Sequence, residues 1–267
     1  MAALLDIHIS ARYGKQSVLS EVRLSIEPGD ILGLVGQSGS GKSTLGLAIL
    51  GLLDRRGGDV TGEILFDGRD LLRLKDKEMR RIRGKEIALV LQSAASALNP
   101  ALRIEDHFSE AWSAHSPRSW REKRGDALAT LGELNLPATG EFLRRYPHQI
   151  SVGQAQRVLI ALALLHRPRL IVADELTSAL DLVTTHEVLR ALRRASEIAN
   201  TAVLFISHDL GAVSALCHSV AILRDGTIVE TAPAAQLFAH PQQDYTRQLI
   251  ALHRATIEPG PLVRHSL

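Results

Sequence analysis

Nine consecutive residues near the N-terminus constrain the fold of this chain more than any other feature. Positions 36–44 read Gly-Gln-Ser-Gly-Ser-Gly-Lys-Ser-Thr and complete the pattern G-x-x-x-x-G-K-S/T. The apolar run at 31–35 predicts a buried strand before this loop, and the run at 45–50 predicts a helix after it. A glycine-rich turn in that setting binds phosphate, because backbone N–H groups and the helix N-terminus point at the anion. The segment therefore predicts an α/β fold with a nucleotide site.

The loop residues have separate chemical roles. The glycines let the backbone curl around phosphate oxygens. Lys42 carries a positive charge that reaches the β- and γ-phosphates, and the Ser43 hydroxyl is a ligand for Mg²⁺. The predicted nucleotide-binding residues of the loop are Gly36, Gln37, Ser38, Gly39, Ser40, Gly41, Lys42, Ser43 and Thr44.

Composition excludes several classes of protein. With 267 residues, 45% of them hydrophobic and 22% charged, the chain has the composition of an ordinary soluble globular protein. The formal charge of +2 gives no reason to expect binding to nucleic acid. Cys217 is the single cysteine, so no disulfide and no cysteine-ligated metal site forms within the chain. We expect no signal peptide at the N-terminus and no membrane-spanning segment, since no apolar run approaches about 18 residues.

Strand and helix patterns alternate along most of the chain. Strands are predicted within 3–32 and at 63–68, 87–91, 170–173 and 202–206, with a hairpin at 219–231. Helices are predicted at 45–50, 76–83, 183–199, 209–217 and 233–254. The alternation indicates a mostly parallel sheet covered on both faces. Residues 104–165 carry helical periodicity and little strand signal, which predicts a mostly helical insert.

Polar groups with suitable chemistry come directly after three of the predicted strands. Asp174 and Glu175 end one strand, where the first can hold Mg²⁺ and the second can orient or deprotonate the attacking water. His208 comes after a second strand and can sense the γ-phosphate or hold that water. Gln92 ends a third strand, and its amide can ligate Mg²⁺ or water. Alone, the two acids also suit a solvated strand end, His208 suits a place beside a helix cap, and Gln92 indicates nothing. Together they indicate a site, because ligands bind at the carboxyl ends of strands in such sheets.

Taken together, these motifs resemble the ATP-binding subunits of ABC transporters over about residues 3–254. The resemblance implies that Tyr13 stacks on adenine, that Gln92 is the Q-loop glutamine, and that His208 is the switch histidine. It implies that Asp174 is the Walker B aspartate and Glu175 the catalytic glutamate. The family signature corresponds to residues 150–154, which supply Ser151, Gly153 and Gln154 to a nucleotide, and the D-loop corresponds to 178–181, which supplies Asp181.

The same resemblance implies the architecture and the assembly. It predicts a P-loop NTPase core of the RecA type with an antiparallel β-subdomain and a helical subdomain inserted at about 94–165. These parts make one ABC ATPase domain over 1–254, with a loose tail at 255–267. Two ATPase subunits, identical or different, then pair head to tail, and each ATP with its Mg²⁺ lies between one subunit's phosphate loop and the other's signature.

Two segments indicate to which branch of the ABC transporter family the chain is similar. Residues 96–100, Ser-Ala-Leu-Asn-Pro, and the segment 240–247 look like the peptide/nickel importers, although that branch often has proline where this chain has Asp244. The resemblance then implies membrane permease subunits as partners and, indirectly, an extracytoplasmic substrate-binding protein. It places the chain on the cytoplasmic face of the cell membrane. It does not name the substrate, because specificity in this family lies in the other chains.

Two residues depart from the family pattern. Val152 replaces the first glycine of the signature, and a β-branched residue disfavours positive φ and crowds a phosphate. We expect the site that faces Val152 to be the weaker one, unless Val152 sits where negative φ suffices. Leu176 replaces the usual proline after Asp-Glu, which we expect to be tolerated.

Three other functions fit parts of the pattern. An ATP-binding subunit of a carbon–phosphorus lyase complex resembles the same branch and serves no transporter. A soluble ABC ATPase of translation or DNA repair usually has tandem domains or a coiled-coil insert, which this chain lacks. A catalytically inactive regulatory subunit would not need the intact Lys42, Asp174, Glu175 and His208.

Overall fold

The apolar run before the phosphate loop forms a central strand of the larger of two sheets. The computed structural model describes residues 3–177 and 180–257. All five residues of β3 (Ile31–Val35) are buried, and the strand pairs in parallel with both β8 (Ala202–Ser207) and β9 (Ser219–Arg224). The six strands have the order β10-β9-β3-β8-β7-β6. The remaining strands are β6 (Ile87–Val90), β7 (Leu170–Asp174) and β10 (Thr227–Pro233), of which β10 runs antiparallel to β9.

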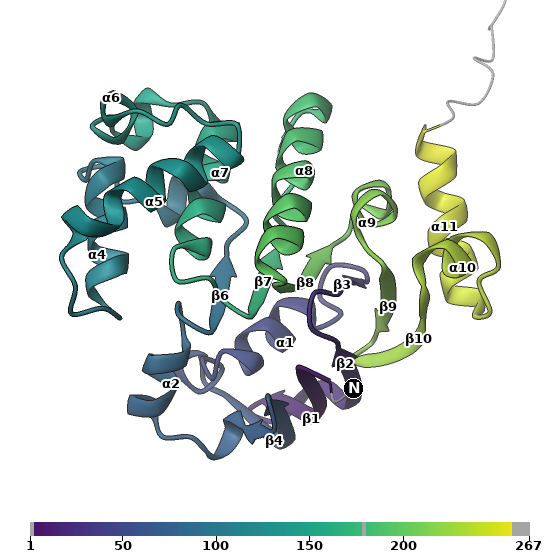
Figure 1. The fold of residues 1–267 in the computed structure, drawn as a ribbon. Coiled ribbons are helices and arrows are strands. Elements are labelled where there is room, and N and C mark those ends of the chain that lie inside the picture. The colour runs from purple at the N-terminus through teal and green to yellow at the C-terminus, as the bar shows by residue number, and fades with distance from the viewer. Residues whose placement is uncertain (1–2, 178–179, 258–267) are drawn as a thin grey trace, which may run out of the picture.

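The smaller sheet is antiparallel and has four strands in the order β2-β1-β4-β5. Buried and exposed residues alternate along β1, as expected for a strand with one face on a core. Figure 1 shows α1 (Lys42–Ile49) between the two sheets, and residues of α1 and of both sheets share one apolar cluster. The strands of this sheet are β1 (Leu5–Tyr13), β2 (Gln16–Ile26), β4 (Gly58–Phe66) and β5 (Arg69–Asp70).

Helices form the rest of the molecule. Between β6 and β7 the described chain contains no strand, and Figure 1 shows this segment as a helical lobe beside the larger sheet. Its helices are α3 (Ala94–Ala97), α4 (Ile104–Ser113), α5 (Trp120–Glu133), α6 (Gly140–Leu143) and α7 (Val152–Leu164). The helices outside the lobe are α2 (Asp76–Ile82), α8 (Leu182–Ala199), α9 (Leu210–Leu216), α10 (Ala234–Ala239) and α11 (Asp244–Ile257).

The structure confirms the predicted fold class and differs from the prediction near the C-terminus. The stretch 233–254, predicted as continuously helical, contains two helices with a break after α10. Pro241 lies in that break, where a proline cannot continue a helix, and the Glu230 carboxylate accepts hydrogen bonds from the N–H groups of Gln242 and Gln243. Helix α11 runs to Ile257, past the predicted start of the tail at 255. The division of the chain at 94–165 into a separate subdomain stays a prediction.

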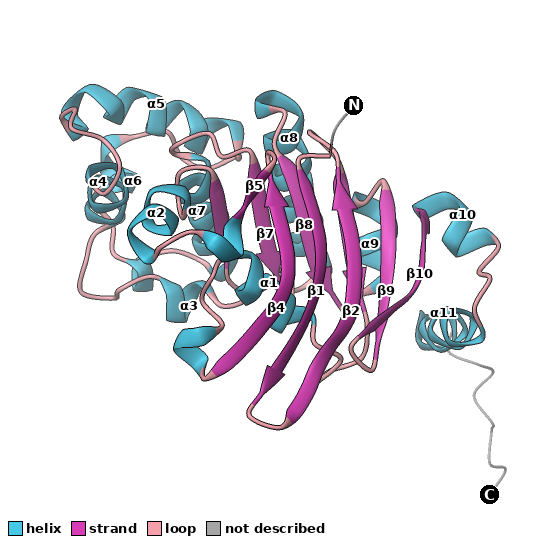
Figure 2. Cartoon of the chain, turned by 90° about the horizontal axis from the view of Figure 1, so that it is seen from below, coloured by secondary structure: helices cyan, strands magenta, loops and turns pink. Residues whose placement is uncertain are grey.

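No helix within 3–177 and 180–257 is long and apolar enough to cross a membrane. Figure 2 shows the smaller sheet on one side of the larger one, while α8 and α9 lie on its opposite side. The larger sheet is therefore covered on both faces, as the strand–helix alternation predicted.

Gly33 tests the close packing of α9 on β3. A Cβ atom at Gly33 would lie 2.8 Å from Val213 Cγ1 and 3.0 Å from Cys217 Sγ, so either α9 or the strand must move. We expect Gly33→Ala to lower the free energy of unfolding by about 1–3 kcal/mol in urea denaturation. The control is Gly125→Ala on α5, where a Cβ atom meets nothing within 4 Å and helix propensity favours alanine by about 1 kcal/mol. Equal stability of Gly33→Ala and wild type would contradict the packing.

Candidate nucleotide site

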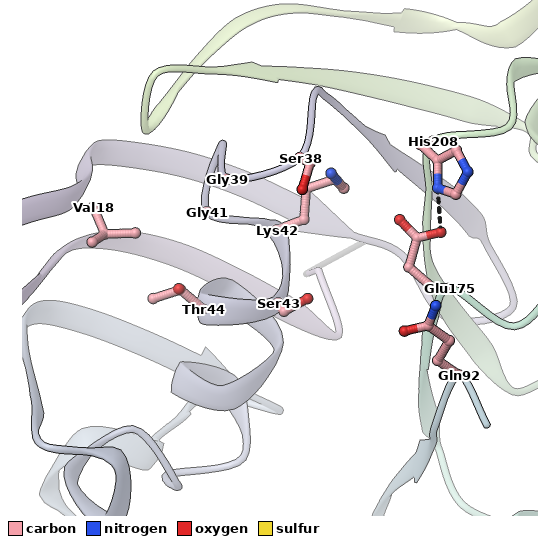
Figure 3. Close-up of a pocket in the computed structure, with 10 residues that line it drawn as sticks. All are labelled: Val18, Ser38, Gly39, Gly41, Lys42, Ser43, Thr44, Gln92, Glu175 and His208. Atoms are coloured by element: carbon pink, nitrogen blue, oxygen red, sulfur yellow. Dashed lines mark hydrogen bonds and ion pairs between the residues drawn. The ribbon is translucent and has the colours of Figure 1, made fainter. Parts of the chain in front are cut away.

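A cavity of about 560 Å³ opens at the carboxyl ends of the parallel strands. Figure 3 shows side chains from the phosphate loop on one side of it and Gln92, Glu175 and His208 on the other. Four segments far apart in sequence therefore meet at one place, as predicted from their positions at the carboxyl ends of strands. The lining residues are Val18, Ser38, Gly39, Gly41, Lys42, Ser43, Thr44, Gln92, Glu175 and His208.

Glycine is required at several positions of the phosphate loop. Gly39 and Gly41 have φ of +83° and +107°, which side-chain-bearing residues rarely adopt. Gly36 is needed for space, since a Cβ atom there would lie 2.3 Å from the backbone oxygen of Leu223. The curled backbone that a phosphate needs is thus built into the loop.

Lys42 lies inside this loop with its side chain almost fully buried. Its Nζ donates to the backbone oxygens of Gly36 at 2.7 Å and Gln37 at 2.9 Å. Burial lowers the pKa of the ammonium, while the carboxylates of Glu175 and Asp174 act in the opposite direction. Because only two carbonyls solvate this cation among the described hydrogen bonds, a phosphate anion is a strong additional partner for it.

Ser43 and Asp174 supply the oxygen ligands that Mg²⁺ prefers. Ser43 is the second residue of α1, Asp174 ends β7, and Ser43 Oγ donates to Asp174 Oδ1 at 3.3 Å. Burial raises the pKa of the Asp174 carboxyl, and the hydrogen bond from Ser43 partly offsets that effect. A hydroxyl and a carboxylate that face each other beside a phosphate loop fit a Mg²⁺ bound together with a nucleotide.

Glu175 and His208 form a pair across two adjacent strands. Glu175 Oε2 lies 2.5 Å from His208 Nδ1, with the two side chains 16% and 63% exposed (Figure 3). The pair exists because β7 and β8 run in parallel and the Glu175 N–H donates to the Ile206 oxygen at 2.9 Å. Glu175 has a φ of +51°, a left-handed conformation that costs a non-glycine residue about 1–2 kcal/mol and is common at functional sites.

Two residues near the cavity differ from expectation. Tyr13 ends β1, is partly buried against the core of the smaller sheet, and is not among the residues that line the cavity. Its stacking on a purine stays a prediction. Val18 on β2 does line the cavity, and the sequence patterns did not predict it. Nothing in its local pattern marks it, because it reaches the cavity only through the packing of β2 beside the loop.

The residues assigned to the signature and the D-loop lie elsewhere. Ser151 caps α7, where its Oγ accepts from the Gln154 N–H at 3.2 Å and Gln154 Oε1 accepts from the Ser151 N–H at 3.1 Å. Asp181 caps α8 by accepting from the Thr184 N–H at 2.9 Å. Gly153 has no room for a side chain, since a Cβ atom would lie 2.4 Å from Thr184 Cγ2. None of these residues lines the cavity, and Ser178 and Ala179 lie outside the described residues.

The structure also bears on the two departures from the family pattern. Val152 is the first residue of α7 and is not among the residues with positive φ, which supports the alternative that negative φ suffices at this position. Its side chain is 66% exposed, and crowding of a phosphate by this side chain stays a prediction. Leu176 is fully buried in the larger core cluster, which gives the residue after Glu175 a packing role of its own.

Comparison with known proteins connects this geometry to a family. The family profile described as "ABC transporter" matches residues 19–178. A probable D,D-dipeptide transport ATP-binding protein of Escherichia coli strain K12 is 41% identical over 238 residues, covering 89% of this chain and 73% of that protein. A metal-staphylopine import system ATP-binding protein of Staphylococcus aureus strain NCTC 8325 is 35% identical, covering 91% and 89%.

Among solved structures, a dimeric ATP-binding cassette in a post-hydrolysis state bound to ADP and Pi superposes with a TM-score of 0.69. It is 29% identical in sequence, and the match covers 85% of this chain and 98% of that one. The similarity therefore extends over most of the chain.

Lys42 gives the direct test of the cavity as a nucleotide site. We expect Lys42→Ala to weaken binding of a fluorescent ATP analogue and to abolish most hydrolysis, because the variant lacks the cation that neutralises the β- and γ-phosphates. The control is Lys123→Ala, since Lys123 is a cation on α5 that does not line this cavity. Unchanged affinity and unchanged turnover in Lys42→Ala would show that the nucleotide binds elsewhere.

Proposed function

Because this chain belongs to the ABC transporter family of ATP-binding, ATP-hydrolysing proteins, we propose that it powers import through a transporter of the peptide/nickel type. The observation that carries the proposal is the meeting of the phosphate loop, Gln92, Glu175 and His208 around one cavity. The two relatives described above are named for transport of a D,D-dipeptide and of a metal-staphylopine complex. A small peptide or a peptide-like metal chelate is therefore the proposed class of cargo, and transport is favoured over service to a carbon–phosphorus lyase.

Different residues of the cavity would bind the phosphates, hold Mg²⁺ and activate the attacking water. The loop at 36–44 would hold the phosphates through its backbone N–H groups, with Lys42 beside the transferred phosphoryl group. Ser43, Asp174 and Gln92 would hold Mg²⁺, which neutralises charge on the phosphate oxygens when it is bound. Glu175 would take the proton of the attacking water, and His208 orients the Glu175 carboxylate by its contact at Nδ1.

None of the described signature and D-loop residues lines the cavity, which supports a site shared by two chains. Ser151, Gly153 and Gln154 sit at the N-terminus of α7, where the helix dipole attracts an anion. We propose that they bind an ATP held by the phosphate loop of a second ATPase subunit, with Asp181 alongside. The dimeric state of the related ATP-binding cassette supports this arrangement.

Besides a second ATPase subunit, the proposed partners are membrane permease subunits. The described part of the chain has no helix that is long and apolar enough to cross a membrane. The surface near Gln92 is the proposed contact with those permeases, and an extracytoplasmic binding protein would act through them. We accordingly place the chain on the cytoplasmic face of the cell membrane, with no role for nucleic acid.

Glu175→Gln tests the assigned base. The amide has nearly the shape of the carboxylate but takes up no proton, so we expect ATP binding to persist and turnover to fall about 10²–10⁴-fold. Phosphate release by the assembled complex is the measurement, with Glu141→Gln as the control, since Glu141 on α6 pairs with Arg145 outside the cavity. Near-normal turnover of Glu175→Gln would assign proton transfer to another group.

A further inference from the structure

Gln156 is a buried amide that joins two parts of the proposed site. It lies on α7, four residues after Val152, and the residue is only 1% exposed. Its Nε2 donates to the backbone oxygen of Leu91 at 3.2 Å, across 65 positions of sequence. A polar side chain in such a position is costly unless its hydrogen bonds are made, so the contact fixes where α7 and residue 91 lie relative to each other.

The Leu91 oxygen matters for the site because its peptide group connects directly to Gln92. Strand β6 ends at Val90, which pairs with Ala173, so Leu91 lies past the ladder of the sheet. The Leu91 C=O and the Gln92 N–H belong to one planar peptide group, and rotation of that plane moves both. By holding the oxygen, Gln156 sets the orientation of the backbone from which the Gln92 side chain enters the cavity.

A second buried side chain on α7, that of Arg157, connects this helix to two other parts of the chain. Arg157 is 8% exposed, and its guanidinium donates to the Asn135 oxygen at 3.0 Å and pairs with Glu187 at 3.2 Å. These contacts tie α7 to the chain just after α5 and to α8. Helix α7 is thus held against three neighbours, and of these two buried side chains only Gln156 contacts the segment that leads into the cavity.

We infer that Gln156 is a positioning residue that makes Gln92 and the N-terminus of α7 move as one unit. A displacement of Gln92 by a nucleotide or a permease then shifts Ser151 and Gln154, which lie within two turns of Gln156 on the same helix. The site in one chain is thereby linked to the groups that this chain offers to its partner. The inference rests on the proposed roles of Gln92 and of the Ser151 end of α7.

The test is Gln156→Met in the complex purified with its partner subunits. Methionine keeps the length and volume of the side chain and removes the donor. We expect kcat for ATP to fall about 2- to 10-fold, the effect of one lost hydrogen bond, with KM changed less than about twofold. Hydrogen exchange should be faster at residues 91–93, and ATP with Mg²⁺ should no longer alter exchange at 152–157. If this variant does not fold, Gln156→Leu, which also removes the donor and is of similar volume, gives the same comparison.

Thr130→Val is the matched control. It removes one side-chain hydrogen bond to a carbonyl, from Thr130 Oγ1 to the Asp126 oxygen at 3.0 Å, within the same helical lobe and away from Leu91. We expect it to leave kcat and the exchange at 91–93 unchanged. Wild-type kinetics and exchange in Gln156→Met would overturn the inference while leaving ATP hydrolysis established. Failure of wild type itself to hydrolyse ATP in a Lys42-dependent way would instead overturn the proposed function.

Discussion

The structure of the site depends on the parallel register of four strands. Val35 pairs with Ser207, Ile206 with Asp174, and Ala173 with Val90, so the residues just after these strands emerge at one edge of the sheet. The phosphate loop, His208, Glu175 and Gln92 occupy those positions. A shift of one residue in any pairing would turn the corresponding side chain to the other face and remove it from the cavity.

Charge in the cavity depends on this register as well. Lys42 is buried and donates hydrogen bonds to two backbone oxygens. The carboxylates of Glu175 and Asp174 are close enough to favour its charged form. Burial raises the pKa of the Asp174 carboxyl, which Ser43 partly offsets. The cavity therefore pairs a desolvated cation with desolvated carboxylates. A nucleotide phosphate and Mg²⁺ are complementary to these groups, because each finds an opposite charge that water solvates poorly.

Sequence patterns predicted the parts of the site whose chemistry is local. The glycine spacing at 36–44 identifies the phosphate loop. The apolar runs before Asp174 and His208 identify strands and place these two residues where the strands end. Val18 could not be found in this way, since it reaches the cavity through tertiary packing of a different sheet. Tyr13 was predicted to stack on a purine ring. It packs on the apolar cluster shared by the two sheets and is not among the lining residues, so the stacking stays a prediction. The helix at 233–254 was predicted without its break, although Pro241, which cannot continue a helix, marks that break in the sequence.

Under the proposed function, two chains together complete each hydrolytic site. The most direct test compares ATP binding with ATP hydrolysis by the purified chain, alone over a concentration series and with each candidate second ATPase subunit. We predict nucleotide affinity that is independent of chain concentration, and turnover per chain that appears only when a second ATPase subunit supplies its α7 N-terminus. Full turnover by a monomeric chain, constant at every concentration, would contradict the account.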